Sequence, residues 1–567
     1  MNFQKIAAHH SATSFLNALF LEWKGVKKSE EEFVIDLKKN ERLFIPIKKF
    51  SLLGRHHYEG VFILELADGT QSELTFEEVA KKLCHHLAPE FSTTDAQIHD
   101  FLLRIRNSAQ NIEQSLKMRS SHYEEIQKPS ADFKTAEQGL LTGHTFHPTP
   151  KSRSEFSDAD YETYSPEMGG KFPLSWVLVK NEILFEKHSK DFKDLSWLKD
   201  LYAQNVETGF TPFPLHPWQK PFIFKHPDVA QYLEKGWIKE AAEVRTQWFP
   251  TSSLRTIYNQ ESRYQLKFSL NVRLTNSVRH LLVKELDRGL QVDDVFNHSL
   301  GKEFSDHNPQ FGVINEPVFA ALKDQYGQPI QISLMMGRYN PFKENNEAIV
   351  VATLTQDHPE FKQNLIQNYI ENYSKTEKVD LNTASKLWFL EFLLVALRPL
   401  INAQSGYGIL LGSHQQNMIL ELKDNRPYRS YFRDCNGTGY TLMGYELFHK
   451  DVPSLVKENG NILEGEEANY LFGYYIIINT TFNVISSIAH GGHVSEEELV
   501  ICLRNFLIDL KKENPKDPQF LDYLLNRETL MHKGNFFCSF KDINENTESN
   551  PLSIYTEIPN PIFTRIR

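Results

Sequence analysis

The chain changes its hydrophobic periodicity several times, and each change predicts a different kind of element. Residues 11–23 and 101–118 carry apolar side chains at the three-to-four-residue spacing of amphipathic helices, and 61–66 alternates like a short strand. The stretch 120–136 is polar, contains a proline and lacks periodicity, which predicts a boundary. We therefore expect a mostly helical first unit over residues 1–130.

Strict alternation of apolar and polar residues marks the clearest strand, at 267–275. Its apolar positions alternate with positions that include the cations Lys267 and Arg273. Upstream, 251–258 is also strand-like, and the polar residues 259–262 between the two would turn the chain back. The pattern predicts an antiparallel hairpin with one face in the core and cations on the other.

A second hairpin is predicted from the apolar runs 406–411 and 416–422. This arrangement places His414 at the turn and Asn417 at the start of the returning strand. Functional residues often lie at such turns because the strands hold them rigidly.

The later part of the chain is expected to form a helical core. A strand-like run ends in the polar residues 338–347, which predicts a second boundary and gives units over 131–342 and 343–567. The most apolar stretches, 387–401 and 470–488, are interrupted by charged or amide side chains. Neither offers the roughly 20 clean apolar residues of a membrane span, so both predict buried helices and no membrane association.

Composition mainly excludes classes of function. The 567 residues are 40% hydrophobic and 24% charged, as in folded globular proteins, and the net charge of -11 argues against nucleic-acid binding. Any anionic ligand must therefore meet a local group of cations. Cys84, Cys435, Cys502 and Cys538 show no CxxC spacing, and the first residues lack the pattern of a secretory signal. A cytoplasmic protein is expected.

The sequence GHTFHPTPKSR gathers His144, His147, Lys151 and Arg153 within ten residues. Its two prolines forbid the regular helix on which a metalloprotease carries HExxH. Lysine, arginine and histidine side chains offer charge-assisted hydrogen bonds to phosphate oxygens, so a phosphate clamp is one interpretation. A solvated basic loop would have the same composition.

The first predicted hairpin and the residues after it supply a second polar and cationic set. Its members are Ser253, Arg255, Thr256, Lys267, Arg273, Thr275 and Arg279. Like charges on one strand pair repel each other unless anions neutralise them, so the set predicts a triphosphate or polycarboxylate site. The alternative is that acids elsewhere in the chain form structural ion pairs with these cations.

A third set consists of His414, Gln416, Asn417, Arg433 and Asp434. The amides can donate hydrogen bonds to phosphate or to a base, the histidine can hold a carboxylate, and the aspartate is a hard oxygen ligand suited to magnesium. The polar end of an ordinary hairpin would look similar.

Common catalytic and nucleotide signatures are missing. The sequence has no GxxxxGK[ST] and no GxSxG, and the glycines of 406–412 open no predicted helix. The motif HGGH at 490–493 follows a buried apolar stretch, and we expect it to end a helix through glycine rather than to bind a metal.

Taken in order, these motifs resemble the aerobactin-synthetase family of NRPS-independent siderophore synthetases, from about Glu137 to the C-terminus. GHTFHPTPKSR, HPWQ at 216–219, SSLRT at 252–256, HQQN at 414–417 and RD at 433–434 occur in the order of that family. Six short motifs in order over most of the chain, counting the closing NP, are far more specific than any one of them.

The resemblance implies an α+β fold shaped like a cupped hand, with a thumb, fingers and palm, antiparallel sheets and a helical C-terminal part around a central ATP cleft. It implies an ATP- and magnesium-dependent ligase that adenylates a carboxylate of citrate and passes it to an amine or hydroxyl, releasing pyrophosphate and AMP. A polyamine nucleophile and a homodimer are favoured. The alternatives are a non-catalytic nucleotide-binding or ferric-siderophore-binding protein, or a reductase, although a reductase needs clustered cysteines for iron and sulfur.

The resemblance also assigns roles by position. The expected ATP contacts are His147, Lys151, Arg153, Ser253, Arg255, Thr256, Lys267, Gln416 and Asn417. Citrate would be held by Thr275, Arg279 and His414, magnesium by Asp434, and the catalytic residues would be Arg279, His414 and Lys267. The family usually carries an acid where this chain has Gly412, so Glu421, or water and phosphate oxygens, would complete the magnesium shell.

Overall fold

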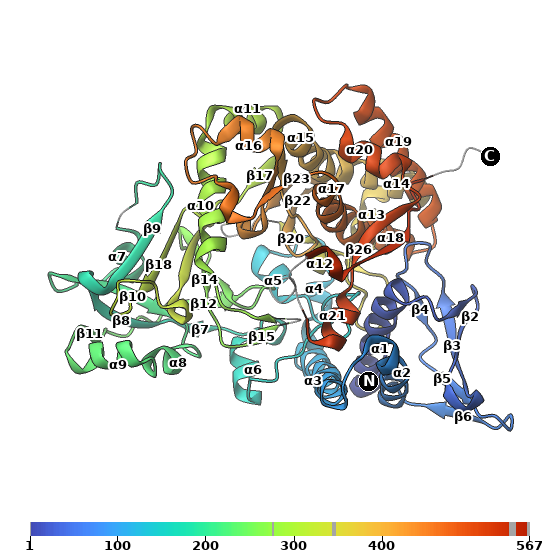
Figure 1. Ribbon diagram of the computed structural model, residues 1–567. Coiled ribbons are helices and arrows are strands. Elements are labelled where there is room, and N and C mark those ends of the chain that lie inside the picture. The colour runs from blue at the N-terminus through green and yellow to red at the C-terminus, as the bar shows by residue number, and fades with distance from the viewer. Residues whose placement is uncertain (1, 195, 275–276, 343–346, 544–550, 564–567) are drawn as a thin grey trace.

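Helices and sheets alternate along the whole chain (Figure 1). The computed structural model describes residues 2–194, 196–274, 277–342, 347–543 and 551–563. Among these residues two strand pairs are parallel and the others are antiparallel. The protein is therefore a mixed α+β protein with several antiparallel sheets, as the sequence predicts.

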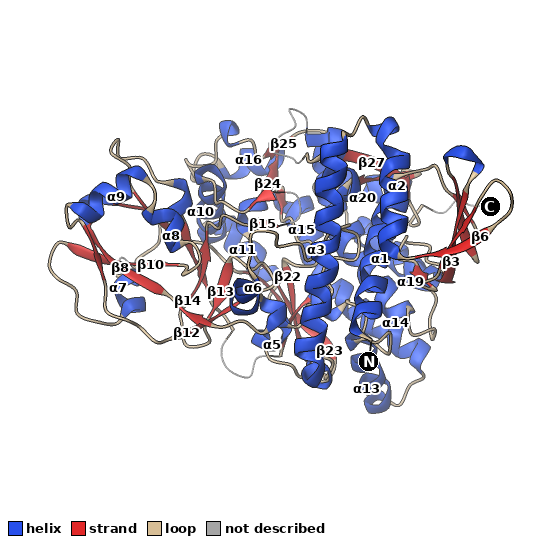
Figure 2. Ribbon diagram, turned by 90° about the horizontal axis from the view of Figure 1, so that it is seen from below, coloured by secondary structure: helices blue, strands red, loops and turns tan. Residues whose placement is uncertain are grey.

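The N-terminal part contains three long helices: α1 (Phe3–Glu22), α2 (Phe76–Phe91) and α3 (Asp95–Arg119). The last two begin with capping boxes at Thr75 and Thr94, in which side chain and backbone satisfy each other's hydrogen bonds. Helices α1 and α3 lie side by side along their length (Figure 2). Both were expected from the periodicity at 11–23 and 101–118.

A six-stranded antiparallel sheet lies beside these helices. Its strands are β1 (Lys27–Lys28), β2 (Glu32–Asp36), β3 (Arg42–Lys49), β4 (His57–Tyr58), β5 (Phe62–Glu65) and β6 (Gln71–Leu74). The sequence pattern predicts only the strand at 61–66. Pro46 lies inside β3, and a proline argues against a strand that is paired on both sides.

A seven-stranded sheet forms the middle of the chain, in the order β7-β12-β13-β14-β19-β18-β9. In chain order its strands are β7 (Phe172–Pro173), β9 (Leu184–His188), β12 (Gln247–Pro250), β13 (Thr256–Tyr258), β14 (Tyr264–Phe268), β18 (Val318–Leu322) and β19 (Met335–Tyr339). A three-stranded sheet of β8 (Ser175–Lys180), β10 (Phe210–Leu215) and β11 (Ile238–Glu240) shares a hydrophobic core with it.

The first predicted hairpin is present, with a shorter returning strand than expected. Strands β13 and β14 pair antiparallel, and Thr256 lies opposite Lys267. The returning strand ends at Phe268 because the backbone beyond it pairs with a later segment, where Leu270 N donates to Arg279 O at 3.1 Å. This second pairing brings Arg279 close to the hairpin.

The second predicted hairpin is wrong. Strand β21 (Ile409–Leu410) pairs with β24 (Gly439–Thr441), whereas β22 (Met418–Lys423) pairs with β23 (Arg426–Phe432). The two-residue turn between β22 and β23, Asp424 and Asn425, has positive φ at both positions, which is the geometry that tight hairpins favour. His414 still lies in a turn, since Asn417 N donates to its carbonyl at 2.7 Å.

Strands β22 and β23 belong to a four-stranded sheet with β17 (Phe311–Val313) and β20 (Ala348–Val350). The apolar stretches of the C-terminal part form helices inside its hydrophobic core. One runs through α14 (Leu381–Phe392) and α15 (Arg398–Tyr407), and the other through α17 (Glu466–Gly473) and α18 (Phe482–Ala489), each pair joined by a π-helical turn.

The helix from Glu466 to Ala489 has the length and apolar composition of a membrane span, with a mean hydropathy of 1.3, but 89% of its most apolar window is buried inside the protein.

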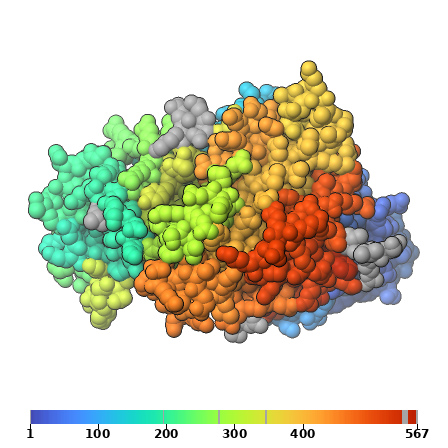
Figure 3. Space-filling view, turned by 90° about the horizontal axis from the view of Figure 1, so that it is seen from above, coloured from blue at the N-terminus to red at the C-terminus, as the bar shows by residue number. Residues whose placement is uncertain are grey.

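The C-terminal residues, orange to red, cover the centre of one face of the molecule, and the N-terminal residues, blue, lie at its edge (Figure 3). The boundaries near residues 130 and 342 stay predictions.

Candidate active site

Opposite charges from two sheets meet in a buried group. Lys267 on β14 forms an ion pair with Asp434, and its Nζ lies 3.8 Å from Glu316 Oε1. Arg338 on β19 donates to the same Glu316 oxygen from Nε at 2.9 Å and Nη2 at 2.6 Å. Asn436, with its amide oriented to suit both neighbours, donates to Glu316 Oε2 at 2.7 Å and accepts from Lys267 at 3.1 Å. The group joins the seven-stranded sheet to the loop after β23.

Asp434 reaches this group because the chain turns sharply after β23. Its φ of 71° lies in the left-handed region, which aspartate tolerates better than most residues. Burial opposes its ionisation, but Lys267, Arg338 and Arg255 outweigh burial and hold the pKa of Asp434 well below its usual range. The carboxylate is therefore charged.

Arg255, Arg279 and His414 surround the same aspartate. Arg255 Nη1 lies 3.5 Å from the carbonyl oxygen of Arg279, and burial together with Arg255 lowers the pKa of Arg279 to about 10. Burial lowers the pKa of His414 to about 4 although Asp434 acts in the opposite direction. His414 is therefore a neutral imidazole beside charged groups. Together with Lys267, these residues form one cluster, as predicted from separate motifs.

A buried clasp fixes the neighbouring backbone. Arg433 donates to the carboxylate of Glu137 at 2.7 and 3.2 Å, and the backbone N of Ser252 donates to Glu137 at 2.8 Å. Arg433 also donates to the carbonyl of Gln416 at 2.8 Å, and Gln416 Nε2 donates to the carbonyl of Ser252 at 2.7 Å. Four segments far apart in sequence are thereby held together.

The two cations of GHTFHPTPKSR are buried, which excludes the solvated basic loop. Lys151 and Arg153 are 4% and 7% exposed, and both pair with Glu167, at 3.2 and 3.3 Å. Burial lowers the pKa of Lys151 to about 8 against the influence of Glu167. Arg153 also lowers the pKa of Arg279, which places this loop beside the central cluster. Structural ion pairs, which the sequence left open as an alternative for the hairpin cations, are present both here and at Lys267.

The remaining predicted residues lie around this centre. Ser253 Oγ is 3.4 Å from Thr251 Oγ1, and the buried Thr256 Oγ1 has no hydrogen-bond partner among the described residues. His147 lies against α21 (Asn535–Lys541), where its Nε2 is 3.4 Å from Ser539 Oγ. Asn417 immediately precedes β22. Thr275 falls outside the described residues.

Two expectations need correction. Arg273 does not share a strand face with Lys267 but pairs with Asp542 at 2.7 Å, because β14 ends before it. Glu421 lies away from the charged group. It is on β22, three residues beyond Met418 and therefore roughly 10 Å from it at the rise of a strand, and it accepts a hydrogen bond from Tyr431 at 3.1 Å. Glu316 is therefore the second acid of the group.

The sequence motifs do not include the acids that neutralise the cations, namely Glu137, Glu167 and Glu316. They also do not include Arg338 and Asn436, which contact Glu316. None of them forms a local motif with its partner. The available signal is indirect: buried cations in a net acidic chain require buried acids, without indicating which ones.

The oxygen donors fit a magnesium ion. Asp434, Glu316 and the Asn436 amide provide hard oxygen atoms, and magnesium is usually held by one or two carboxylates with phosphate and water. Gly289 borders this place: a Cβ there would lie 3.3 Å from Glu316 Oε2. The absence of a side chain at Gly289 therefore leaves space beside this oxygen.

The fold and the site define an α+β protein in which cations, amides and acids from distant segments converge in one anion-binding cluster. Residues 132–356 match the IucA / IucC family, and residues 386–548 match the ferric iron reductase FhuF-like transporter family. An N(2)-citryl-N(6)-acetyl-N(6)-hydroxylysine synthase of Vibrio mimicus is 35% identical over 97% of this chain and 95% of its own length. This chain belongs to the IucA / IucC family.

Two further comparisons extend this result. A spermidine-citrate ligase of Bacillus anthracis is 30% identical over 82% of this chain and 79% of its own length. The solved structure of ATP-bound aerobactin synthetase IucA from Klebsiella pneumoniae superimposes with a TM-score of 0.92 at 28% identity, over 98% of this chain and 100% of that structure. The likeness therefore spans the whole chain.

Proposed function

We propose that this protein is an ATP-dependent ligase of siderophore biosynthesis that joins a carboxylate of citrate to an amine. The name of the Vibrio relative states a citryl product, that of the Bacillus relative states a ligase of spermidine and citrate, and the Klebsiella relative was solved with ATP. The observation that carries the proposal is the convergence of Arg255, Lys267, Arg279, His414 and Asp434 in one cluster.

The reaction would proceed in two balanced steps. A citrate carboxylate oxygen attacks the α-phosphorus of ATP, the bond to the β-phosphate oxygen breaks, and pyrophosphate leaves. The amine nitrogen then attacks the acyl carbon of the citryl-adenylate, the bond to the phosphate oxygen breaks, AMP leaves and the nitrogen loses a proton. The protein stabilises charge on oxygen atoms and aligns the reactants, so no covalent enzyme nucleophile is needed.

ATP is proposed to bind where the ion pairs are found. Its phosphates would bind Lys267 on the hairpin and Lys151 and Arg153 beside Glu167, which now pair with acids. They would also bind Arg255, which immediately precedes β13 and donates to backbone carbonyls. The unpartnered hydroxyl of Thr256, and the side chains of His147, Ser253, Gln416 and Asn417, would complete the contacts.

Citrate is proposed to bind between Arg279, Thr275 and His414. Arg279 supplies a bidentate cation for a carboxylate. His414 is kept neutral by burial and accepts a hydrogen bond from the backbone N of Gln416 at Nδ1, so its Nε2–H can donate to a citrate oxygen. Lys267, next to Asp434, would stabilise the negative charge on phosphate oxygen in the transition state.

Asp434 and Glu316 would hold magnesium, which when bound neutralises charge on the triphosphate. Lys267 and Arg338 hold these carboxylates in place, so their charge is positioned before the nucleotide arrives.

We further propose the arrangement of a cupped hand, with thumb, fingers and palm over residues 1–130, 131–342 and 343–567, and a cytoplasmic homodimer.

The second candidate is a ferric-siderophore reductase or binding protein, which the match at 386–548 favours. The four cysteines come from different elements, and in the described part of the chain no cysteine belongs to a group of metal-ligating side chains. An iron–sulfur centre would need clustered thiolates. Iron content and visible absorption of the purified protein distinguish this candidate.

Pyrophosphate release across a grid of carboxylates and amines tests the ligase. We expect release only with ATP and citrate together, and mass spectrometry of the product identifies the amine. A panel of spermidine, diaminopropanoate and a hydroxylysine derivative covers linear polyamines and amino acids. The Lys267→Met variant is the inactive control. A purified protein that releases no pyrophosphate with any di- or tricarboxylate would end the proposal.

A further inference from the structure

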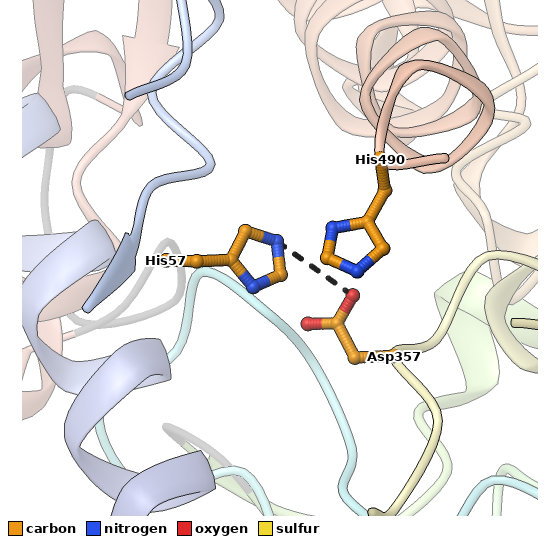
Figure 4. A group of neighbouring side chains, drawn as sticks. All are labelled: His57, Asp357 and His490. Carbon is orange, nitrogen blue, oxygen red and sulfur yellow. Dashed lines mark ion pairs between the residues drawn. The ribbon is translucent and has the colours of Figure 1, made fainter. Parts of the chain in front are cut away.

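His57, Asp357 and His490 meet at the junction of three segments outside the site described above (Figure 4). His57 begins β4 of the N-terminal sheet, Asp357 follows α12 (Val351–Leu354), and His490 caps the end of α18. One ligand atom from each residue lies within 4.8 Å of the other two. Both imidazoles turn towards the same carboxylate.

The separations differ from those of a hydrogen-bonded contact. His57 Nε2 lies 3.9 Å from Asp357 Oδ1, longer than a hydrogen bond. Two donors that each lie about 2 Å from a shared ion are about 3–4 Å apart, so this spacing suits joint coordination. The buried Nδ1 of His490 has no hydrogen-bond partner among the described residues. The three groups therefore lie around one point, with His57 and Asp357 close enough to attract each other but too far apart for a hydrogen bond.

The carboxylate is oriented by a well-fixed arginine. Arg55 donates to Asp357 Oδ1 at 2.9 Å, and it is held in turn by the carbonyl of Thr355 and the hydroxyl of Ser487, both at 2.6 Å. A carboxylate has about four acceptor positions, so Arg55 leaves room for another ligand. Metal-binding carboxylates are commonly held by such an outer partner, which fixes their orientation.

The turn that carries His490 is also fixed. Lys49 on β3 donates to the carbonyl oxygens of Ala489 and His490 at 2.6 and 3.1 Å. The rings of His57 and His490 lie 4.4 Å apart between centroids.

We propose that His57, Asp357 and His490 bind a divalent first-row transition-metal ion that fastens the N-terminal sheet to the end of α18. Two imidazoles and one carboxylate suit zinc or iron(II), whereas magnesium prefers oxygen ligands. Three protein ligands leave at least one coordination position for water. This site is separate from the oxygen site at Asp434, and HGGH then both ends a helix and supplies a ligand.

The test uses the full-length protein, which is first treated with a chelator. The chelator is then removed. Zinc is titrated calorimetrically, and cobalt(II) is titrated by its visible absorption, which reports nitrogen and oxygen coordination. We expect one ion per chain, a higher thermal midpoint with zinc, and no displacement by excess magnesium. The His57→Gln and His490→Gln variants should each weaken zinc binding by at least about tenfold and lose the cobalt spectrum.

His493→Ala is the matched control, because His493 lies three positions from His490 in the same turn and is exposed. It should bind zinc like the wild type. The metal-free thermal midpoints of all variants are measured first, and if one glutamine variant does not fold, the other decides the result. The proposal is overturned if the wild type binds no zinc, if both glutamine variants bind it normally, or if His493→Ala loses it.

Discussion

The Glu137→Gln variant is predicted to loosen the ATP-binding face without altering a residue proposed to touch ATP. Glu137 and Arg433 are each 2% exposed and are joined by two charge-assisted hydrogen bonds, at 2.7 and 3.2 Å. Glutamine keeps the shape of the side chain but removes its charge. It also places an amide donor against the guanidinium, so the charge of Arg433 stays buried without compensation.

The expected cost follows from this burial. Two unit charges about 4 Å apart attract by about 4 kcal/mol at the effective dielectric constant of a protein, and breaking a buried pair from one side typically costs about 3–5 kcal/mol. We expect the free energy of unfolding to fall by about this amount. Because Arg433 also holds the carbonyl of Gln416, and Gln416 holds Ser252, the KM for ATP should rise as well.

Urea unfolding followed by tryptophan fluorescence measures the stability, and pyrophosphate release measures the KM. Asp36→Asn is the matched control, since the Lys27–Asp36 pair has a similar separation of 2.7 Å but side chains that are 75% and 55% exposed. Exposed pairs contribute little, so this variant should unfold like the wild type.

The double variant Glu137→Gln/Arg433→Gln adds a second check. Removing both charges leaves no unpaired ion, so it should be less destabilised than Glu137→Gln alone. If Glu137→Gln unfolds at the same urea concentration as Asp36→Asn, the clasp does not stabilise the site and the reasoning is refuted.

Three further predictions concern the chemistry of the site. Arg279→Ala should raise the KM for citrate by about 10- to 100-fold through loss of a charged hydrogen bond, and unaltered citrate dependence would contradict its role. The kcat/KM for ATP should fall above pH about 8, where Lys151 loses its charge, and Lys151→Arg should move this fall to higher pH. Superimposable pH profiles of the wild type and the variant would exclude Lys151 as the titrating group. Asp434→Asn should raise the magnesium concentration for half-maximal pyrophosphate release by at least about tenfold, whereas Glu421→Gln should not; equal effects would reject the oxygen site at Asp434.

Local patterns predicted those parts of the fold that depend on neighbouring residues. The periodicity at 11–23 and 101–118 is that of α1 and α3, and the apolar stretches at 387–401 and 470–488 are buried helices. The hairpin of β13 and β14 was also readable, because alternation and a polar turn lie within a few residues of one another. Such features arise from interactions that short segments make by themselves.

Strand partners were harder to predict. The apolar run at 406–411 precedes a polar turn, yet β21 pairs with β24 and β22 pairs with β23. Likewise the alternation beyond Phe268 does not extend β14, because Arg279 supplies a competing backbone partner. A strand pattern specifies which face is apolar but not which edge will complete the backbone hydrogen bonds.

The sequence by itself determined that cations, amides and an aspartate are grouped in local motifs, which need a counter-charge or a ligand once they are buried. Only the tertiary structure decided that Glu137, Glu167 and Glu316 supply this counter-charge, and that His57 and His490 share Asp357. The physical reason is that a buried charge needs an opposite charge within a few ångströms in space, and folding can bring that partner from any position along the chain.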